Sequence, residues 1–401
     1  MSDALSADGS YEAWLLKYLE LASEYFGPEK DAVDIGANAG IITVILASLQ
    51  SKGRVLAFEP VSFLCDRLKQ NLKKNNITNA IVERAIVDDH DGATRKIEIP
   101  EGAVGGASVA GELSGLQIRV ERHPDHKNQL GAAIYEPHTV VHTESVTTLR
   151  LDSYLRERHL DLDIKIIKID VEHWELPVLA GAVNTIREHD PVVLIEFNVQ
   201  IRSMAVERYG CELYRTLSNQ FAYIFCIDRL SCKLLPLHSY AELRGAMLTG
   251  HFVEDLLCFN SDGFLEFLGP HIAAKRFSTY NAGRLTLSRN GCGAIVSFSH
   301  YPDDWCCGHD FFLYAQSSKT GRIRLRFTNP GPRGIVRLLI ASRGQLAELD
   351  LRREAVTRDF DLSAGEDTLI YVFVEQIFSA SRFFGNDDPR ELGVQIAVEE
   401  I

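Results

Sequence analysis

The sequence predicts an α/β fold over roughly its first two thirds and an all-β fold after that. Short apolar runs in the first part alternate with amphipathic stretches of helical period, which is typical of βαβ units and a parallel sheet. After residue 270 the helical period disappears, and alternating runs recur about every ten residues between Gly, Pro, Asn and Asp. That spacing is typical of a β-sandwich. We therefore expect two domains, residues 1–270 and residues 275–401.

Seven apolar runs are expected to form a doubly wound sheet in the first domain. These runs are Asp31–Ile35, Arg54–Phe58, Ala80–Arg84, Ile164–Ile169, Val192–Phe197, Ala222–Ile227 and Asp255–Phe259. The expected helices are Tyr11–Tyr25, Ile41–Leu49, Phe63–Asn75, Glu175–His189 and Glu212–Ser218. Between about residues 94 and 148 the rhythm breaks into short alternating strands, which predicts a β-hairpin insertion near the mouth of the ligand crevice.

Composition and charge exclude several classes of protein. At 401 residues, with 46% apolar and 24% charged residues, the chain is typical of a soluble globular protein of two domains. The net charge of −13 argues against nucleic acid as a partner. The acidic start is not a secretory signal, and no run approaches the ~18 apolar residues of a membrane span. We expect a cytoplasmic protein whose eight cysteines, lacking any CxxC pair, are reduced thiols.

The charge also supports a boundary near residue 270. From Lys275 onward the chain has 16 basic and 16 acidic residues, so the first 274 residues carry the whole charge of −13. Gly269-Pro270 provides a break in regular structure at the same point.

A glycine turn follows the first predicted strand and leads into a helix. The stretch from Asp34 to Gly40 has the form D-x-G-x-N-x-G, with Gly36 and Asn38 between them, and so differs from the G-x-G-x-x-G of a pyrophosphate site. Glycine permits φ > 0 or a close approach to a ligand, and the helix start offers free N–H groups. An acid in this turn suits a positively charged ligand, and S-adenosylmethionine has both a sulfonium and an ammonium.

Glu59, at the end of the next strand, is placed to accept both ribose hydroxyls of such a cofactor. The alternative is a surface strand, turn and helix with a chance pair of glycines. An acid some 20 residues after the turn, followed by further strands, favours the nucleoside site.

Six polar side chains should gather in one crevice, because ligands of open α/β sheets bind outside the carboxyl ends of the strands. They are Asp34, Glu59, Asp170, Glu172, His173 and Glu196. A hydroxyl acceptor needs a base, for which Glu172 and His173 are candidates, with Glu196 a weaker one. For Glu172 and for Glu196, the alternative to a catalytic role is a purely structural role as a buried carboxylate. Trp174 is expected to pack at the crevice wall, with stacking on a sugar as the alternative.

The same carboxylates could instead bind a metal ion. Asp170 and Glu196, at neighbouring strand ends, could hold Mg²⁺ beside an acceptor diol. Because no third ligand is evident, the sequence predicts no metal.

Together these stretches resemble the FkbM-type S-adenosylmethionine-dependent methyltransferases, a branch of the class I, Rossmann-like enzymes, over roughly residues 30 to 200. The motifs that carry the resemblance are Val33–Gly40, Phe58–Pro60, Thr147–Asp152 and Ile167–Glu172, followed by Glu175, Leu179 and Gly181. The resemblance assigns Asp34, Gly36, Asn38 and Gly40 to the cofactor loop, Glu59 to the ribose and Arg84-Ala85 to the adenine side. It places Asp170 and Glu172 at the reaction centre, where we also expect Asp170 to hold either the cofactor's methionine end or the acceptor. The family usually has Gly where this chain has His173.

The resemblance implies methyl transfer, commonly to a hydroxyl of a sugar or secondary metabolite. The end of the chain, Arg382–Glu399, is similar to small β-modules attached to bacterial polysaccharide-building enzymes, which favours a glycan acceptor. Arg322, Arg324 and Arg326 share one strand face, either as a glycan or phosphate surface or as an ordinary solvated face. The alternatives are N-methylation, a non-sugar acceptor, and a binding protein whose enzyme domain is inactive.

Overall fold

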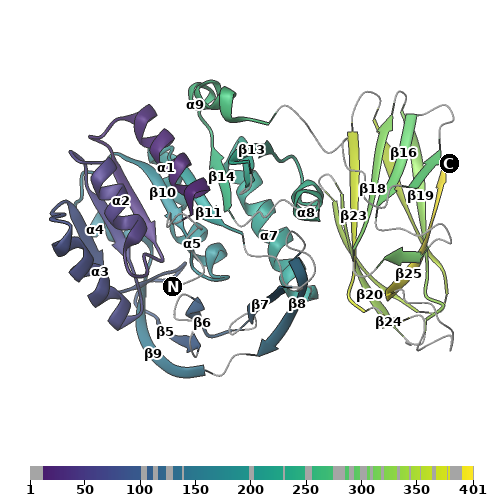
Figure 1. Cartoon of the computed structure of the whole chain (residues 1–401), viewed down its shortest axis with the longest axis horizontal. Coiled ribbons are helices and arrows are strands. Elements are labelled where there is room, and N and C mark those ends of the chain that lie inside the picture. The colour runs from purple at the N-terminus through teal and green to yellow at the C-terminus, as the bar shows by residue number, and fades with distance from the viewer. Residues whose placement is uncertain are drawn as a thin grey trace. The chain divides into compact units, whose positions relative to one another are not determined.

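The computed structural model describes much of the chain, which divides into two compact units (Figure 1). The described residues are 12–100, 106–111, 116–122, 130–137, 140–197, 203–228, 231–248, 255–273, 285–288, 293–298, 305–307, 310–317, 320–331, 335–342, 345–352, 354–363, 367–376, 378–379 and 391–400. The first unit comprises Met1–Ile201, Arg215–Pro236 and Phe252–Ala273. The second unit comprises Arg202–Tyr214, Leu237–His251 and Ala274–Ile401.

An eight-stranded mixed sheet forms the centre of the first unit, with the order β13-β12-β14-β11-β10-β1-β2-β3. These strands are β1 (Asp31–Ile35), β2 (Val55–Phe58), β3 (Ala80–Glu83), β10 (Ile164–Ile169), β11 (Val192–Glu196), β12 (Tyr223–Asp228), β13 (Lys233–Pro236) and β14 (Asp255–Phe259). The pairs from β3 to β11 are parallel, whereas β14 is antiparallel to both β11 and β12. The expected number of seven strands is therefore wrong by one. The additional strand, β13, is only four residues long and ends in a proline, so its sequence carries no recognisable alternation.

The described residues also form α-helices, several of which pack on this sheet. They are α1 (Ala13–Phe26), α2 (Ile41–Leu49), α3 (Ser62–Lys74), α4 (Leu151–Glu157), α5 (Glu175–Gly181), α6 (Val183–His189), α7 (Met204–Gln220), α8 (Tyr240–Leu248) and α9 (Asp262–Leu268). One core cluster joins α1, α2 and α9 to one face of the sheet, with Leu15, Leu46 and Phe264 fully or almost fully buried. No helix in the described part of the chain is long and apolar enough to cross a membrane.

Two helix predictions need correction. The single helix expected over Glu175–His189 is two helices that meet at Ala182, whose φ of −117° is not helical. The short helix expected near Glu212–Ser218 is the longer α7, because the apolar stripe of that segment begins further toward the N-terminus.

The insertion forms two small sheets. Strands β4 (Ile86–Val87), β5 (Thr94–Pro100), β6 (Ser108–Val109) and β9 (Val140–Leu149) make the order β4-β9-β5-β6, and β7 (Leu116–Arg122) pairs with β8 (Leu130–Pro137). Ile97, Val109 and Val146 from the insertion pack with Ala39 of the glycine turn, and Trp174 packs against the same cluster. The insertion therefore packs beside the turn that precedes α2.

The β-rich part of the second unit consists of two antiparallel sheets. One has the order β15-β16-β18-β23-β20-β21, and the other has the order β17-β25-β19-β22, with β24 paired to β25. The strands are β15 (Leu285–Ser288), β16 (Gly293–Phe298), β17 (Trp305–Cys307), β18 (Asp310–Ser317), β19 (Gly321–Thr328), β20 (Val336–Ser342), β21 (Gln345–Leu351), β22 (Val356–Leu362), β23 (Asp367–Val374), β24 (Phe378–Ser379) and β25 (Glu391–Glu400). Side chains from both sheets share one core, including Phe311, Phe327 and Ile396, so the two sheets pack as a sandwich.

Residues upstream of 270 also belong to the second unit. Arg244 on α8 is fully buried, forms an ion pair with Glu207 and donates to the Tyr240 hydroxyl at 2.9 Å. The Tyr240 ring in turn contacts the Tyr371 ring of β23, with 6.2 Å between centroids. The domain limits 1–270 and 275–401 remain a prediction, and a cut at residue 270 would separate Tyr240 from Tyr371.

Candidate active site

The glycine turn runs against the end of the neighbouring strand. Gly36 and Gly40 have φ values of 82° and 87°, so both need the left-handed freedom of glycine. A Cβ on Gly36 would lie 1.7 Å from the carbonyl oxygen of Asp170, and one on Gly40 would lie 2.7 Å from Cγ of Leu68. The glycines thus let the turn pack against the segment after β10 and against α3.

Glu59 is held by the backbone on both sides. Its Oε2 accepts the N–H of Asn38 at 2.7 Å, and its Oε1 accepts the N–H of Val61 at 2.8 Å. Burial raises the pKa of Glu59 to about 7, although the two N–H groups act in the opposite direction. Because a carboxylate oxygen can accept more than one hydrogen bond, both oxygens still have capacity for ribose hydroxyls.

Asp34 has a buried oxygen that lacks a donor. The residue has no exposed surface, and Thr43 Oγ1 of α2 donates to its Oδ2 at 2.6 Å. No group of the described residues donates to Oδ1. Burial raises the pKa of Asp34, and the nearby Lys168 ammonium opposes that shift. A buried acceptor that needs a donor fits the ammonium of S-adenosylmethionine, directly or through a water, so these residues fit the expected cofactor.

Lys168 lies near both Asp34 and Asp170. It was not predicted from the sequence as a site residue. It lies opposite Asp34 in the β1–β10 register and is 5% exposed, and its Nζ donates to Asp170 Oδ2 at 2.7 Å. A lysine within a run of isoleucines predicted to be buried on both faces was the available signal. Thr43, the donor to Asp34, was also missed, because a helical threonine carries no such signal.

Three of the predicted reaction-centre carboxylates come together. One oxygen each from Asp170, Glu172 and Glu196 lie within 4.8 Å of one another, and all three residues are partly exposed. Asp170 follows β10, and Glu196 ends the neighbouring parallel strand β11. Glu172 and His173 both have positive φ values, 50° and 69°, so the chain turns back sharply between Asp170 and α5.

The pKa values of Glu196 and Asp170 in this cluster are shifted in opposite directions. Burial raises the pKa of Glu196 well above its ordinary value, and the charges of Asp170 and Glu172 add to that shift. Burial also acts on Asp170, but Lys168 and a hydrogen bond with Glu196 outweigh it and lower the Asp170 pKa. This shift favours the protonated form of Glu196, which makes it a poor base. Glu172 and His173 remain as candidate bases.

His173 is buried, and its backbone has a conformation that favours glycine. At φ 69° an L-residue is strained, whereas glycine adopts this region freely. Its backbone N–H donates to Glu175 Oε1 at 3.2 Å at the start of α5. The neighbouring Trp174 packs against the insertion core beneath the Arg95 guanidinium, 5.3 Å from the ring centroid, as expected of a wall residue.

The remaining motif residues have structural partners. Arg84 forms an ion pair with Glu144 of β9 at 2.6 Å and donates to the Pro60 carbonyl oxygen, while Ala85 beside it is buried. Asp152 accepts from the N–H and the hydroxyl of Thr185 at 2.9 and 2.8 Å, which fixes the start of α6. An adenine role for Arg84 and Ala85 stays a prediction.

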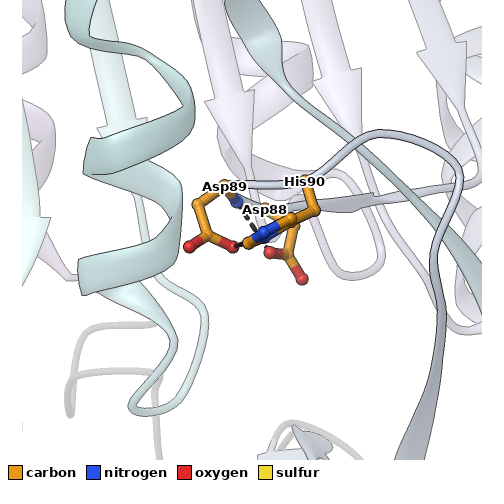
Figure 2. Close-up of side chains that lie close together, drawn as sticks. All are labelled: Asp88, Asp89 and His90. Atoms are coloured by element: carbon orange, nitrogen blue, oxygen red, sulfur yellow. Dashed lines mark hydrogen bonds and ion pairs between the residues drawn. The ribbon is translucent and has the colours of Figure 1, made fainter.

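A second cluster of metal-ligand type, Asp88, Asp89 and His90, follows β4. Figure 2 shows these three side chains with His90 against Asp89, where Nδ1 and Oδ1 are 2.6 Å apart. Asp88 is fully buried, and its two oxygens accept the Asp89 N–H at 2.7 Å and Arg95 Nε at 2.9 Å. Both oxygens of the buried carboxylate are thus satisfied by the protein itself.

A parallel sheet with a glycine turn after its first strand and a buried acid directly after the next strand is the arrangement of a nucleoside-binding α/β protein. The particular kind follows from comparison with known proteins: residues 34–218 match the family model of the Methyltransferase FkbM domain. The match describes that segment as a methyltransferase domain of the FkbM type, for which S-adenosylmethionine is the methyl donor. The family resemblance and the cofactor expected from the sequence are thereby confirmed.

Two curated proteins are similar to this chain over shorter stretches. The AMB antimetabolite synthetase AmbE of Pseudomonas aeruginosa is 25% identical over 163 residues, which cover 38% of this chain and 8% of that protein. Methyltransferase 1 of Beauveria bassiana is 23% identical over 156 residues, covering 39% of this chain and 59% of that protein. The matches thus span less than two thirds of the length of either relative.

Among solved structures, the methyltransferase FkbM from Methylobacillus flagellatus KT is similar at 16% identity. The alignment covers 58% of this chain and 44% of that chain, with a TM-score of 0.32. A score of that size supports no conclusion about the acceptor.

Proposed function

We propose that this chain transfers a methyl group from S-adenosylmethionine to a hydroxyl oxygen of an acceptor bound beside Glu172. The observation that carries the proposal is the position of Glu172. Its carboxylate lies with Asp170 and Glu196 at the carboxyl ends of β10 and β11, next to the glycine turn that follows Asp34 and the end of β1. This is where an acceptor must lie to approach a cofactor held by Asp34 and Glu59.

The cofactor supplies an activated methyl group on a positively charged sulfur. Asp34 would hold its ammonium and Glu59 its ribose hydroxyls, which fixes the methyl carbon relative to the acceptor. Glu172 accepts the acceptor's hydroxyl proton as the oxygen–carbon bond forms. The carbon–sulfur bond breaks with its electron pair going to sulfur, so charge and atoms balance and S-adenosylhomocysteine is the second product.

The acceptor we propose is a sugar or glycan hydroxyl in polysaccharide or glycoconjugate biosynthesis. The arginines of β19, Arg322, Arg324 and Arg326, do not support this proposal. Arg322 pairs with Asp361 at 2.8 Å, and Arg324 pairs with Asp359 at 2.7 Å, across the β19–β22 register. Paired guanidinium groups favour the ordinary solvated strand face over a phosphate or glycan surface.

A non-sugar secondary metabolite is the second candidate acceptor, methylated on oxygen or nitrogen. It is favoured by the similarity to a protein described as an antimetabolite synthetase. A nitrogen acceptor that is already neutral needs no base, so the two chemistries make different demands on Glu172.

The test uses the full chain with methyl-labelled S-adenosylmethionine and a panel of sugar, glycan and small-metabolite acceptors. We expect acceptor-dependent transfer of label to a hydroxyl, and tight binding of S-adenosylhomocysteine by calorimetry. Folded protein that binds neither S-adenosylmethionine nor S-adenosylhomocysteine would refute the proposal and favour a binding protein with an inactive enzyme domain. Label found only on nitrogen would refute the O-methyl assignment.

A further inference from the structure

We propose that Asp170, Glu172 and Glu196 form a binding site for one divalent cation of the hard, oxygen-preferring kind, Mg²⁺ or Mn²⁺. The inference rests on the proposed function only for what the cation would do, not for whether it binds. The sequence alone offered two carboxylates and no third ligand, and the structure supplies the third in Glu172.

The geometry suits a single ion. The three oxygens lie within 4.8 Å of one another. Oxygen ligands lie about 2.0–2.1 Å from Mg²⁺ and about 2.3–2.6 Å from Ca²⁺, so two ligands of one ion are at most about 4.2 Å apart for Mg²⁺ and about 5.2 Å apart for Ca²⁺. The spacing of the three oxygens is of this order. All three residues are partly exposed, so an ion and its remaining water ligands can enter from solvent.

Two parallel strands and a strained turn bring the ligands together. Ile169 and Ile195 are register partners, so Asp170 and Glu196 leave β10 and β11 side by side. The left-handed backbone at Glu172 and His173 then returns the Glu172 carboxylate to the same place. Two consecutive L-residues in this conformation cost of order 1–3 kcal/mol each, and such strain concentrates at functional sites.

An unsatisfied buried oxygen points to a ligand. Glu196 Oε2 is fully buried, and no group of the described residues donates a hydrogen bond to it. Lys168 contributes one positive charge and donates to Asp170 Oδ2. A divalent cation would allow the three close carboxylates to be ionised together, because its charge offsets their mutual repulsion.

The cluster of Asp88, Asp89 and His90 also offers three possible ligand atoms within 4.8 Å of one another, but it lacks an unsatisfied buried oxygen. Both oxygens of its buried carboxylate accept from the protein, one from the Asp89 N–H and one from Arg95. It therefore serves as a matched acidic control within the same unit.

A cation bound by Asp170, Glu172 and Glu196 would determine which class of acceptor binds. An ion with open positions binds two neighbouring oxygens, as in a vicinal diol or a hydroxy acid, and lowers the pKa of a bound hydroxyl. The acceptor class that follows is a molecule with two adjacent oxygen donors, one of which receives the methyl group.

The experiment measures Mn²⁺ binding to full-length protein freed of metal by chelation, using the electron paramagnetic resonance signal of free Mn²⁺. We expect one saturable site in the wild type from which Mg²⁺ displaces Mn²⁺. Glu196→Gln and Glu172→Gln should each weaken binding at least tenfold, and Asp89→Asn should leave it unchanged. Glutamine matches the shape of protonated glutamate, so Glu196→Gln should keep the fold, which circular dichroism checks.

S-adenosylhomocysteine affinity, measured by calorimetry on the same samples, separates the two proposals. Wild-type protein that binds S-adenosylhomocysteine but no Mn²⁺ overturns the cation site and leaves the methyltransferase function standing. Mn²⁺ binding that both glutamine variants retain also overturns it, as does binding lost on Asp89→Asn. Loss in both glutamine variants with intact S-adenosylhomocysteine binding supports it.

Discussion

Two acidic clusters lie in the first unit, and they differ in what satisfies them. Asp88, Asp89 and His90 follow β4, and a backbone N–H and the Arg95 guanidinium occupy the buried carboxylate of Asp88. In the cluster of Asp170, Glu172 and Glu196, the buried Oε2 of Glu196 has no donor among the described residues.

Acid spacing alone therefore does not distinguish a structural cluster from a functional one. In both clusters burial raises the pKa of one acid while the pKa of its neighbour is lowered. The unsatisfied oxygen is the distinguishing feature, because a buried polar group without a partner costs free energy unless a ligand supplies one.

The largest effect is expected from the cluster of Asp170, Glu172 and Glu196. Glu172→Gln should lower kcat by about 10²–10⁴ with S-adenosylhomocysteine affinity nearly unchanged, because the base is lost and the cofactor contacts are not. Steady-state methyl transfer and calorimetry measure the two effects, with Asp89→Asn as the control that keeps full turnover. Full turnover in Glu172→Gln together with none in His173→Gly would make His173 the base.

The next effect concerns Glu59, which belongs to neither cluster. Glu59→Ala should weaken S-adenosylhomocysteine binding by about 1.5–3 kcal/mol, or roughly 10- to 150-fold, because a charged acceptor of the ribose hydroxyls is lost. Calorimetry measures this effect. An unchanged affinity in folded protein would remove Glu59 from the cofactor site.

The pH dependence of stability provides an independent check on Glu59. Its pKa is about 7 in the folded state and near the ordinary 4.5 when unfolded, so the folded state retains a proton through that window. The stabilisation from this proton is complete below pH 4.5 and is lost as the pH rises through about 7. It amounts to at most about 3 kcal/mol. Denaturant unfolding from pH 5 to 8 should show a smaller decline in Glu59→Gln than in the wild type, and equal declines would contradict the assigned pKa.

The structural cluster should affect stability instead of function. Asp88→Asn removes the charge that accepts from Arg95, and should lower the free energy of unfolding by about 1–3 kcal/mol. Affinity for S-adenosylhomocysteine and for Mn²⁺ should remain unchanged. A large loss of either affinity would show that the two clusters are not separate in function.

The smallest effect tests the backbone strain beside Glu172. His173→Gly and His173→Ala both remove the imidazole, but only glycine adopts φ 69° without strain. The glycine variant should therefore be more stable than the alanine variant by about 1 kcal/mol, measured by denaturant unfolding. Equal stability would mean that the turn relaxes once the imidazole is gone.

The sequence by itself determined the α/β sheet, the glycine turn, the β-rich C-terminal region and the family. Periodicity reports burial along a strand or helix, so long apolar runs such as Ile164–Ile169 were located closely. Asp34, Gly36 and Glu59 were found because each follows a strand that the periodicity already marks. Lys168 was visible as a charge within a buried run, although its significance depends on the carboxylates that lie around it.

Only the tertiary structure decided how the acids are used. Whether Glu196 Oε2 or Asp88 Oδ2 has a donor depends on residues far away in the chain or on the path of a turn, which no local pattern encodes. The close packing of Gly36 on the Asp170 carbonyl and the return of Glu172 to Glu196 likewise depend on parallel strands brought together by crossovers. The same holds for β13 and for the helical segments that belong to the second unit. Pairing between distant segments places these elements, and their own propensities are too weak to predict them.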